Sequence, residues 1–201
     1  MKKPLNELIR DTRCLPFRII TADTTYVPEK TGWYKVICVG AGSGCYARTV
    51  SPYHNASGAS GGVAIKVIRL VAETNYSVLV GTDASFNNIM TATGGTNPKQ
   101  AQSSFTPSVG GTATGGDYNF NGSSGESGSD STSAKIYQGA SVNVSLTELT
   151  PIPTALGGVT NGDGVLRYGG GGSLQRIDAN NVVKGDGQPA AVIIIPLEME
   201  E

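Results

Sequence analysis

The sequence predicts an all-β fold, a short-stranded antiparallel β-sandwich with long glycine-rich loops. Three observations support this prediction. Short runs of β-branched and aromatic residues alternate with turn-forming clusters. No stretch with helical periodicity is longer than one or two turns. Glycine accounts for 28 of the 201 residues, about twice its average frequency. Some glycine-rich stretches are candidates for polyglycine II-type helices, which are extended and have three residues per turn.

Seven runs are predicted as strands from their composition and from the turns that bound them. They are residues 33–40, 61–71, 76–80, 89–93, 140–149, 176–183 and 190–197. Residues 61–71 and 76–80 are expected to form a hairpin, because only a short turn separates them. Residues 176–183 would form an edge strand that turns at Asn180 and Asn181. The apolar run 190–197 should pair with 33–40, with Pro196 at a sheet edge or a strand end.

The first 25 residues are predicted to form an N-terminal arm, and residues 26–201 the β domain. One helical turn or two could form at the start of the arm, too short to be stable alone. The arm carries apolar side chains that would dock it on a partner or on the domain: Leu5, Leu8, Ile9, Leu15 and Phe17.

The stretch 110–128 has a three-residue period of small residues or residues that tolerate positive φ. These residues are Gly110, Ala113, Gly116, Asn119, Gly122, Gly125 and Gly128. A three-residue period is typical of polyproline II-type helices, which need neighbours to satisfy their backbone groups. A flexible Gly/Ser linker is the alternative. The aromatic residues Tyr118 and Phe120 favour the ordered interpretation.

Charge and composition exclude several classes of function. Charged residues are 15% of the chain and the net charge is −1, which disfavours a disordered tail and nucleic-acid binding. The N-terminus lacks the apolar region of a signal peptide. No run approaches the roughly 18 apolar residues of a membrane span, so no membrane insertion is expected and synthesis is placed in a cytoplasm.

Cysteine and histidine do not form a metal-binding pattern. The three cysteines, Cys14, Cys38 and Cys45, lack metal-ligand spacing, and the chain has a single histidine. Cys14 and Cys45 could pair, but an odd count leaves a free thiol, which fits a reducing compartment. No metal and no cofactor are expected.

No catalytic motif stands out either. The glycines that follow residue 39 lack the spacing and the helix of a dinucleotide-binding turn. His54 has no nucleophile in a strand–turn–helix elbow beside it. The acidic residues lie in turn-like contexts, so a glycoside-cleaving acid pair is the least supported alternative. The sequence therefore predicts a protein that is not an enzyme.

Aromatic side chains in the glycine-rich loops are the best candidates for contact with a partner. Loops held by a rigid scaffold carry recognition in many proteins, and aromatic rings supply rigid contact area. The alternative, that these rings cap the core from the loop side, is equally supported. The candidate contact residues are Tyr46, Tyr53, His54, Tyr118, Phe120 and Tyr168.

Several sequence blocks resemble, in order, the glycine-rich domain of bacteriophage tail-fibre and tail-tip proteins. The blocks are WYKVICVGAGSG, GASGGVAIKVIRL, TNYSVLVG, NIMTATGG, GTATGGDYNFNGSSGESG and GDGQPAAVIIIPL, and they span roughly residues 27–197. The chain also resembles, more loosely, T-even-type adhesins whose tips are sandwiches of polyglycine II helices.

This resemblance implies a non-enzymatic virion protein at a tail fibre or tail tip, with an oligomeric and often three-fold assembly. The arm would attach to other tail proteins, and the glycine-rich loops would bind a protein or glycan of the bacterial surface. An architectural virion component, such as a fibre, collar or decoration protein whose loops pack on neighbouring subunits, is the alternative. A polysaccharide depolymerase is the enzymatic alternative.

Overall fold

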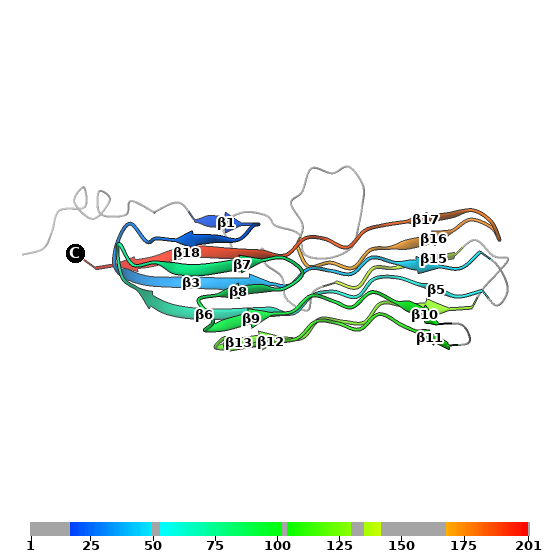
Figure 1. The fold of residues 1–201 in the computed structure, drawn as a ribbon, viewed down its shortest axis with the longest axis horizontal. Helices are drawn as coiled ribbons and strands as arrows, with labels where there is room; N and C mark the ends of the chain where they lie inside the picture. The colour runs from blue at the N-terminus through cyan, green and yellow to red at the C-terminus, as the bar shows by residue number, and fades with distance from the viewer. Residues whose placement is uncertain (1–16, 50–52, 102–103, 130–134, 142–167, 201) are drawn as a thin grey trace, which may run out of the picture.

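The computed structural model describes residues 17–49, 53–101, 104–129, 135–141 and 168–200. All regular elements in these ranges are β-strands, which confirms the predicted fold class. The molecule is elongated, and three parts follow one another along its long axis, as Figure 1 shows. They are a sandwich of two five-stranded sheets, a middle part of extended glycine-rich segments, and a set of two- and three-stranded sheets that we call the tip.

The sandwich consists of two antiparallel sheets. The first has the strand order β1 (Arg18–Ile20), β18 (Ala191–Met199), β3 (Gly32–Val39), β6 (Val63–Leu70) and β13 (Tyr118–Phe120). The second has the order β12 (Ala113–Thr114), β9 (Met90–Ala92), β8 (Ala84–Phe86), β7 (Tyr76–Val80) and β2 (Thr24–Tyr26). Because β1 and β2 pair with β18 and β7, residues 18–20 and 24–26 are built into the sheets.

Alternation along β3 divides the core into two layers. Tyr34, Val36 and Cys38 point into the space between the sheets, where they form a buried cluster with residues of β7, β8 and β9. Ile37 and Val39 point to the opposite face of the first sheet and form a second buried cluster. A strand buried on both faces is expected to be almost continuously apolar, as this one is.

The predicted hairpin of residues 61–71 and 76–80 is wrong. The two segments are the strands β6 and β7, but β6 pairs with β3 and β13, whereas β7 pairs with β2 and β8. The turn between them therefore crosses from one sheet to the other. Leu70 and Tyr76 lie in the same buried cluster, so burying both apolar ends against each other favours the crossing over local pairing.

The predicted pairing of the closing strand is confirmed. β18 runs antiparallel to β3 from Ala191, opposite Val39, to Met199, opposite Gly32. β1 covers β18 only as far as Ile194. Pro196 thus lies where one side of the strand is open, next to a shift in register, as its missing N–H requires.

The expected edge strand at 176–183 is instead a hairpin of β16 (Leu174–Arg176) and β17 (Val182–Lys184). The turn between these strands contains Asn180 and Asn181, as predicted. The run 89–93 contains β9. Most of the predicted strand 140–149 lies outside the described residues.

The middle part is held by backbone hydrogen bonds with a three-residue period. Segment 57–62 lies at its centre, and residues three apart in it donate to the same neighbouring segment. From donor N–H to acceptor carbonyl, the bonds run from Ser57 to Glu126 and Ser60 to Ser123, and from Gly58 to Gly172 and Gly61 to Gly169. A strand alternates between two sides, so this three-sided pattern is that of polyglycine II packing.

Glycine permits the close approach of these segments. A Cβ atom on Gly58 would lie 1.8 Å from the carbonyl oxygen of Ser43, and one on Gly42 would lie 1.8 Å from that of Gly170. Neither position has room for a side chain. The glycine content therefore reflects backbone packing, with carbonyl and N–H groups of neighbouring segments satisfying one another.

The stretch 110–128 is ordered, but it is not one continuous helix. It leaves the middle part at β12, turns at Gly115 with φ +78°, returns along β13 and re-enters the middle part at residue 121. The N–H of Gly122 donates to the carbonyl of Gly111, which joins the two passes. The period arises because each pass supplies glycines at sites of close backbone approach, such as Gly110 and Gly125.

Candidate functional site

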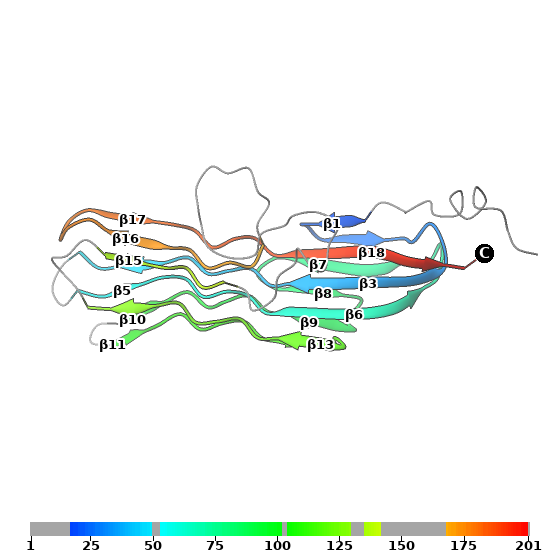
Figure 2. The same cartoon turned by 180° about the vertical axis from the view of Figure 1, so that it is seen from behind.

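The tip contains three small antiparallel sheets at the end of the molecule opposite the sandwich, as Figure 2 shows from behind. Their strands are β4 (Tyr46–Ala47), β5 (Asn55–Ala56) and β14 (Ser127–Gly128); β10 (Lys99–Ala101) and β11 (Ser104–Thr106); and β15 (Lys135–Tyr137), β16 and β17. A small core of Ala47, Tyr137 and Leu174 joins the first and third sheets. Sheets of such short strands are only marginally stable alone, so their stability depends on the glycine-rich segments that lead into them.

Three aromatic side chains gather on the tip. The rings of His54 and Phe105 stack with centroids 5.1 Å apart and an interplanar angle of 3°. Tyr46 packs on Phe105 at 6.1 Å, and Nζ of Lys184 lies 5.9 Å from the centroid of the Tyr46 ring. The three rings are half-buried. We call Tyr46, His54 and Phe105 the aromatic stack.

Arg176 lies behind this surface as a buried hub. Its side chain has no exposed area, and its Nε and one terminal nitrogen donate to Oδ1 of Asn55 at 3.0 and 2.8 Å. It also donates to the backbone carbonyls of Arg48, Asp178 and Ala179. All these acceptors are neutral or main-chain groups. A guanidinium with five donors is suited to joining several loops in this way.

The hub connects the two turns that border the candidate contact residues. Arg48 is the first residue after β4, and Asp178 belongs to the turn between β16 and β17. Tyr53 lies against the hub, with the guanidinium carbon of Arg176 5.5 Å from its ring centroid. Tyr53 therefore packs against Arg176.

The structure brings together three of the six residues predicted from the sequence and separates the others. Tyr46, Tyr53 and His54 lie on the tip. Tyr118 is 65% exposed but lies on β13, at the far side of the glycine-rich middle part. Phe120 is partly buried against the second core cluster, and Tyr168 is 4% exposed within it, so Tyr168 serves the core and has almost no surface to offer a partner.

Sequence reasoning missed Phe105 and Arg176. Phe105 is an isolated phenylalanine in a polar stretch, and an aromatic residue in such a loop was the signal that identified Tyr46 and Tyr53. Arg176 gave no signal, because an arginine in a short strand is normally exposed.

The apolar residues predicted for the arm are only partly described. Phe17 packs partly buried against the second core cluster. Leu5, Leu8, Ile9 and Leu15 lie outside the described residues. Cys38 and Cys45 are free thiols, and Cys14 also lies outside the described residues.

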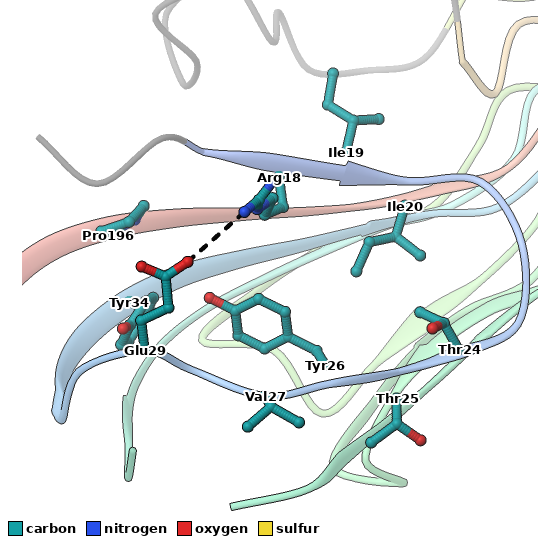
Figure 3. Close-up of a pocket in the computed structure, with 10 residues that line it drawn as sticks. All are labelled: Arg18, Ile19, Ile20, Thr24, Thr25, Tyr26, Val27, Glu29, Tyr34 and Pro196. Atoms are coloured by element: carbon teal, nitrogen blue, oxygen red, sulfur yellow. Dashed lines mark ion pairs between the residues drawn. The ribbon is translucent and has the colours of Figure 1, made fainter. Parts of the chain in front are cut away.

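A second feature is a cavity of about 220 Å³ at the open edge of the sandwich, between β1 and β2. Figure 3 shows Tyr26 and Ile20 lining it, with an ion pair between Arg18 and Glu29 drawn at one side. Burial raises the pKa of Tyr26 to about 12, and the neighbouring Tyr34 adds to this shift. A hydroxyl that stays protonated can only serve as a neutral hydrogen-bonding group here.

The described residues hold no group of three or more histidine, cysteine and acidic side chains close enough to bind a metal ion. They also include no helix of sufficient length and hydrophobicity to cross a membrane.

Comparison with known proteins gives a family assignment. No curated protein gives a significant match to the chain. The family described as "Glycine-rich domain" matches residues 20–192, which includes the middle part, the tip and most of the sandwich. The match starts within β1 and ends within β18, the two paired strands that close the first sheet. The chain therefore belongs to the glycine-rich domain family.

Proposed function

We propose that this protein is a non-enzymatic virion protein of a bacteriophage tail fibre or tail tip and that its tip binds the host surface. The observation that carries this proposal is the aromatic stack, half-exposed at the end of an elongated glycine-rich body. The ordered resemblance of the sequence blocks to phage tail-fibre proteins supports the phage context. The location in the virion is part of the same proposal.

The architecture suits a receptor-binding role because the tip is rigidly connected to the rest of the molecule. The middle part is held by backbone bonds between segments from distant parts of the sequence. A rigid support reduces the conformational entropy that loops lose on binding. Attachment to other tail proteins would involve the opposite end, where β1 and the C-terminal strand lie (Figure 1), and a trimer is the favoured assembly.

The test is adsorption of the full chain, carrying a fluorescent protein at its C-terminus, to cells of the host strain. Figure 1 places the C-terminus at the sandwich end, so the fusion leaves the tip accessible. Saturable adsorption that the unlabelled protein displaces supports the proposal. A folded, oligomeric protein that does not adsorb contradicts it.

An architectural role is the second candidate, and one observation favours it. Three apolar side chains are about half exposed on or beside the sheet of β15, β16 and β17: Ile136 at 53%, Ile177 at 50% and Val183 at 52%. Ile136 and Val183 both lie opposite Gln175. They therefore share one face, which could pack on a neighbouring subunit. An architectural component would assemble with tail proteins and would not adsorb to cells.

A further inference from the structure

We infer that the tip recognises an acidic polysaccharide of the bacterial surface, with sugars that carry carboxylate or phosphate groups. This inference rests on the proposed host-binding function and specifies its ligand. It follows from how charge is distributed along the molecule and from which side chains border the aromatic stack.

Charge is separated between the two ends of the described structure. The tip and the segments next to it contain five basic residues, Arg48, Lys99, Lys135, Arg176 and Lys184, and three acidic ones, Glu126, Asp178 and Asp186. The remaining described residues contain seven acidic side chains and five basic ones. The acidic ones are Asp23, Glu29, Glu73, Asp83, Asp117, Glu198 and Glu200, and the basic ones are Arg18, Lys30, Lys35, Lys66 and Arg69.

Two of the three acidic groups at the tip are occupied by local hydrogen bonds. Glu126 accepts a hydrogen bond from the backbone N–H of Gln138 at 3.1 Å. Asp178 accepts hydrogen bonds from the side chain of Asn181 and from the backbone N–H groups of Asn180 and Asn181. These bonds lower the pKa of Asp178, and the bond from the Asn181 side chain has the largest effect. Both carboxylates stabilise turns and remain charged, so the described tip has a net charge of +2 from its five basic and three acidic residues, against −2 for the other described residues.

A basic group borders the aromatic stack directly. Lys184 is exposed and lies over the ring of Tyr46. Lys99 is exposed on β10 and pairs opposite Thr106, so it lies on the face of this sheet opposite to that of Phe105. An aromatic face accepts the C–H face of a sugar ring through apolar contact, while a neighbouring ammonium attracts an anionic substituent. Together they fit a sugar that is apolar on one face and negatively charged at its edge.

The ligand test uses the full chain and the purified surface polysaccharide of the host strain in two forms. One form is native, and in the other the carboxylates are reduced to alcohols and the phosphates removed, so that the sugar backbone is unchanged. Affinity is measured by biolayer interferometry at several salt concentrations. We expect the native form to bind at least about tenfold more tightly, with an affinity that falls as salt screens the charges.

Matched variants locate the binding on the tip. Lys184→Gln should weaken binding of the native polysaccharide about fivefold to tenfold, since it removes a charge-assisted contact, and Lys184→Arg should retain most of it. Lys30→Gln removes a lysine at the sandwich end and should have no effect. Equal losses in Lys184→Gln and Lys30→Gln would contradict a site at the tip.

The outcomes separate this inference from the function on which it rests. Equal affinity for the charged and neutralised forms overturns the inference. So does adsorption to cells that protease treatment abolishes and that no polysaccharide form reproduces, which indicates a protein receptor and leaves host binding intact. Failure to adsorb to the host at all removes both the function and the ligand.

Discussion

Asp117 completes the hydrogen bonding of β6 by bonding to Val67. Its Oδ2 accepts a hydrogen bond from the backbone N–H of Val67 at 2.9 Å, and its Oδ1 accepts one from Nζ of Lys66 at 3.1 Å. In the register of β13 and β6, the backbone partner of Val67 would be Gly116. The chain turns there after the positive φ of Gly115, so the carboxylate takes the place of a strand carbonyl.

Acid should weaken this sheet edge. The bonds from Val67 and Lys66 lower the pKa of Asp117 from its usual value of 3.8. A lowered pKa in the folded state contributes stability above the unfolded pKa, and this stability is lost as pH falls through the folded value. Asp117→Asn should therefore lower the melting temperature at pH 7 and have less effect near pH 2. Glu198→Gln, an exposed change on β18, is the control, and an equal response of both variants to pH would contradict the assignment.

Alkali should weaken the other edge of the sandwich. The pKa of Tyr26 is raised to about 12 by burial, so its contribution to stability is complete below pH 10 and is lost as pH rises toward 12. Tyr26→Phe should remain stable over a wider alkaline range. Chemical unfolding between pH 9 and 12 tests this, with Tyr118→Phe as a control on an exposed tyrosine. A Tyr26→Phe profile that follows the unmodified protein would show that Tyr26 does not control this transition.

Glycine substitutions should distinguish close packing from open loops. Gly58→Ala places a Cβ atom 1.8 Å from the Ser43 carbonyl oxygen, whereas a Cβ atom on Gly81 meets nothing within 4 Å. Gly58→Ala should destabilise the protein by about 3 kcal/mol or prevent folding, and Gly81→Ala should have little effect. Urea unfolding measures both. Similar stabilities would mean that the middle part is not close-packed.

Replacing Arg176 should loosen the tip. Arg176→Met keeps most of the apolar stem but removes the donor that Asn55 and the carbonyls of Arg48, Asp178 and Ala179 share. The cost should be about 3 kcal/mol, because losing hydrogen bonds from a buried charged group costs roughly 1–3 kcal/mol each and part of the loss is recovered by solvent at the half-buried carbonyls. Arg176→Lys restores the charge without the planar fork and should recover only part of this loss. Hydrogen exchange should rise in the tip while the β3 and β18 amides stay protected; uniform exchange throughout would contradict a local role.

Removing a ring of the aromatic stack should reduce host binding. Phe105→Ala deletes the ring that contacts both His54 and Tyr46, and we expect adsorption to fall about tenfold or more. Tyr118→Ala removes a more exposed ring at the sandwich end and should leave adsorption unchanged. Circular dichroism would check the fold of both variants. Loss of adsorption in Tyr118→Ala alone would move the binding surface to β13.

The sequence was most informative where burial produces a simple pattern. The apolar runs that became β3 and β18 predicted their own pairing, because two long and largely buried apolar strands have few other partners. The connection from Leu70 to Tyr76 was mispredicted, because a short turn can join strands of one sheet or cross between two, and the choice depends on the shared core. Amino-acid composition alone does not show whether the turn stays within one sheet or crosses to the other.

The candidate site was less predictable for a related reason. Loop aromatics are recognisable individually, but whether a ring such as Tyr168 faces solvent depends on segments far away in the sequence. The three-residue period of 110–128 identified glycines at close contacts but not the turn at Gly115 that divides them. The role of Arg176 was not predicted, because two of the residues that supply its acceptors, Arg48 and Asn55, lie more than a hundred positions away.

The glycine-rich middle part also determines how the molecule would respond to mechanical load. Its hydrogen bonds join neighbouring extended segments sideways, so they cross the long axis along which a load would act if the tip binds a surface as proposed. A tension applied between the tip and the sandwich end would strain many of these bonds at once, in shear, instead of opening them one after another from an end. A body made of backbone contacts would then yield only at forces that break several segments free together.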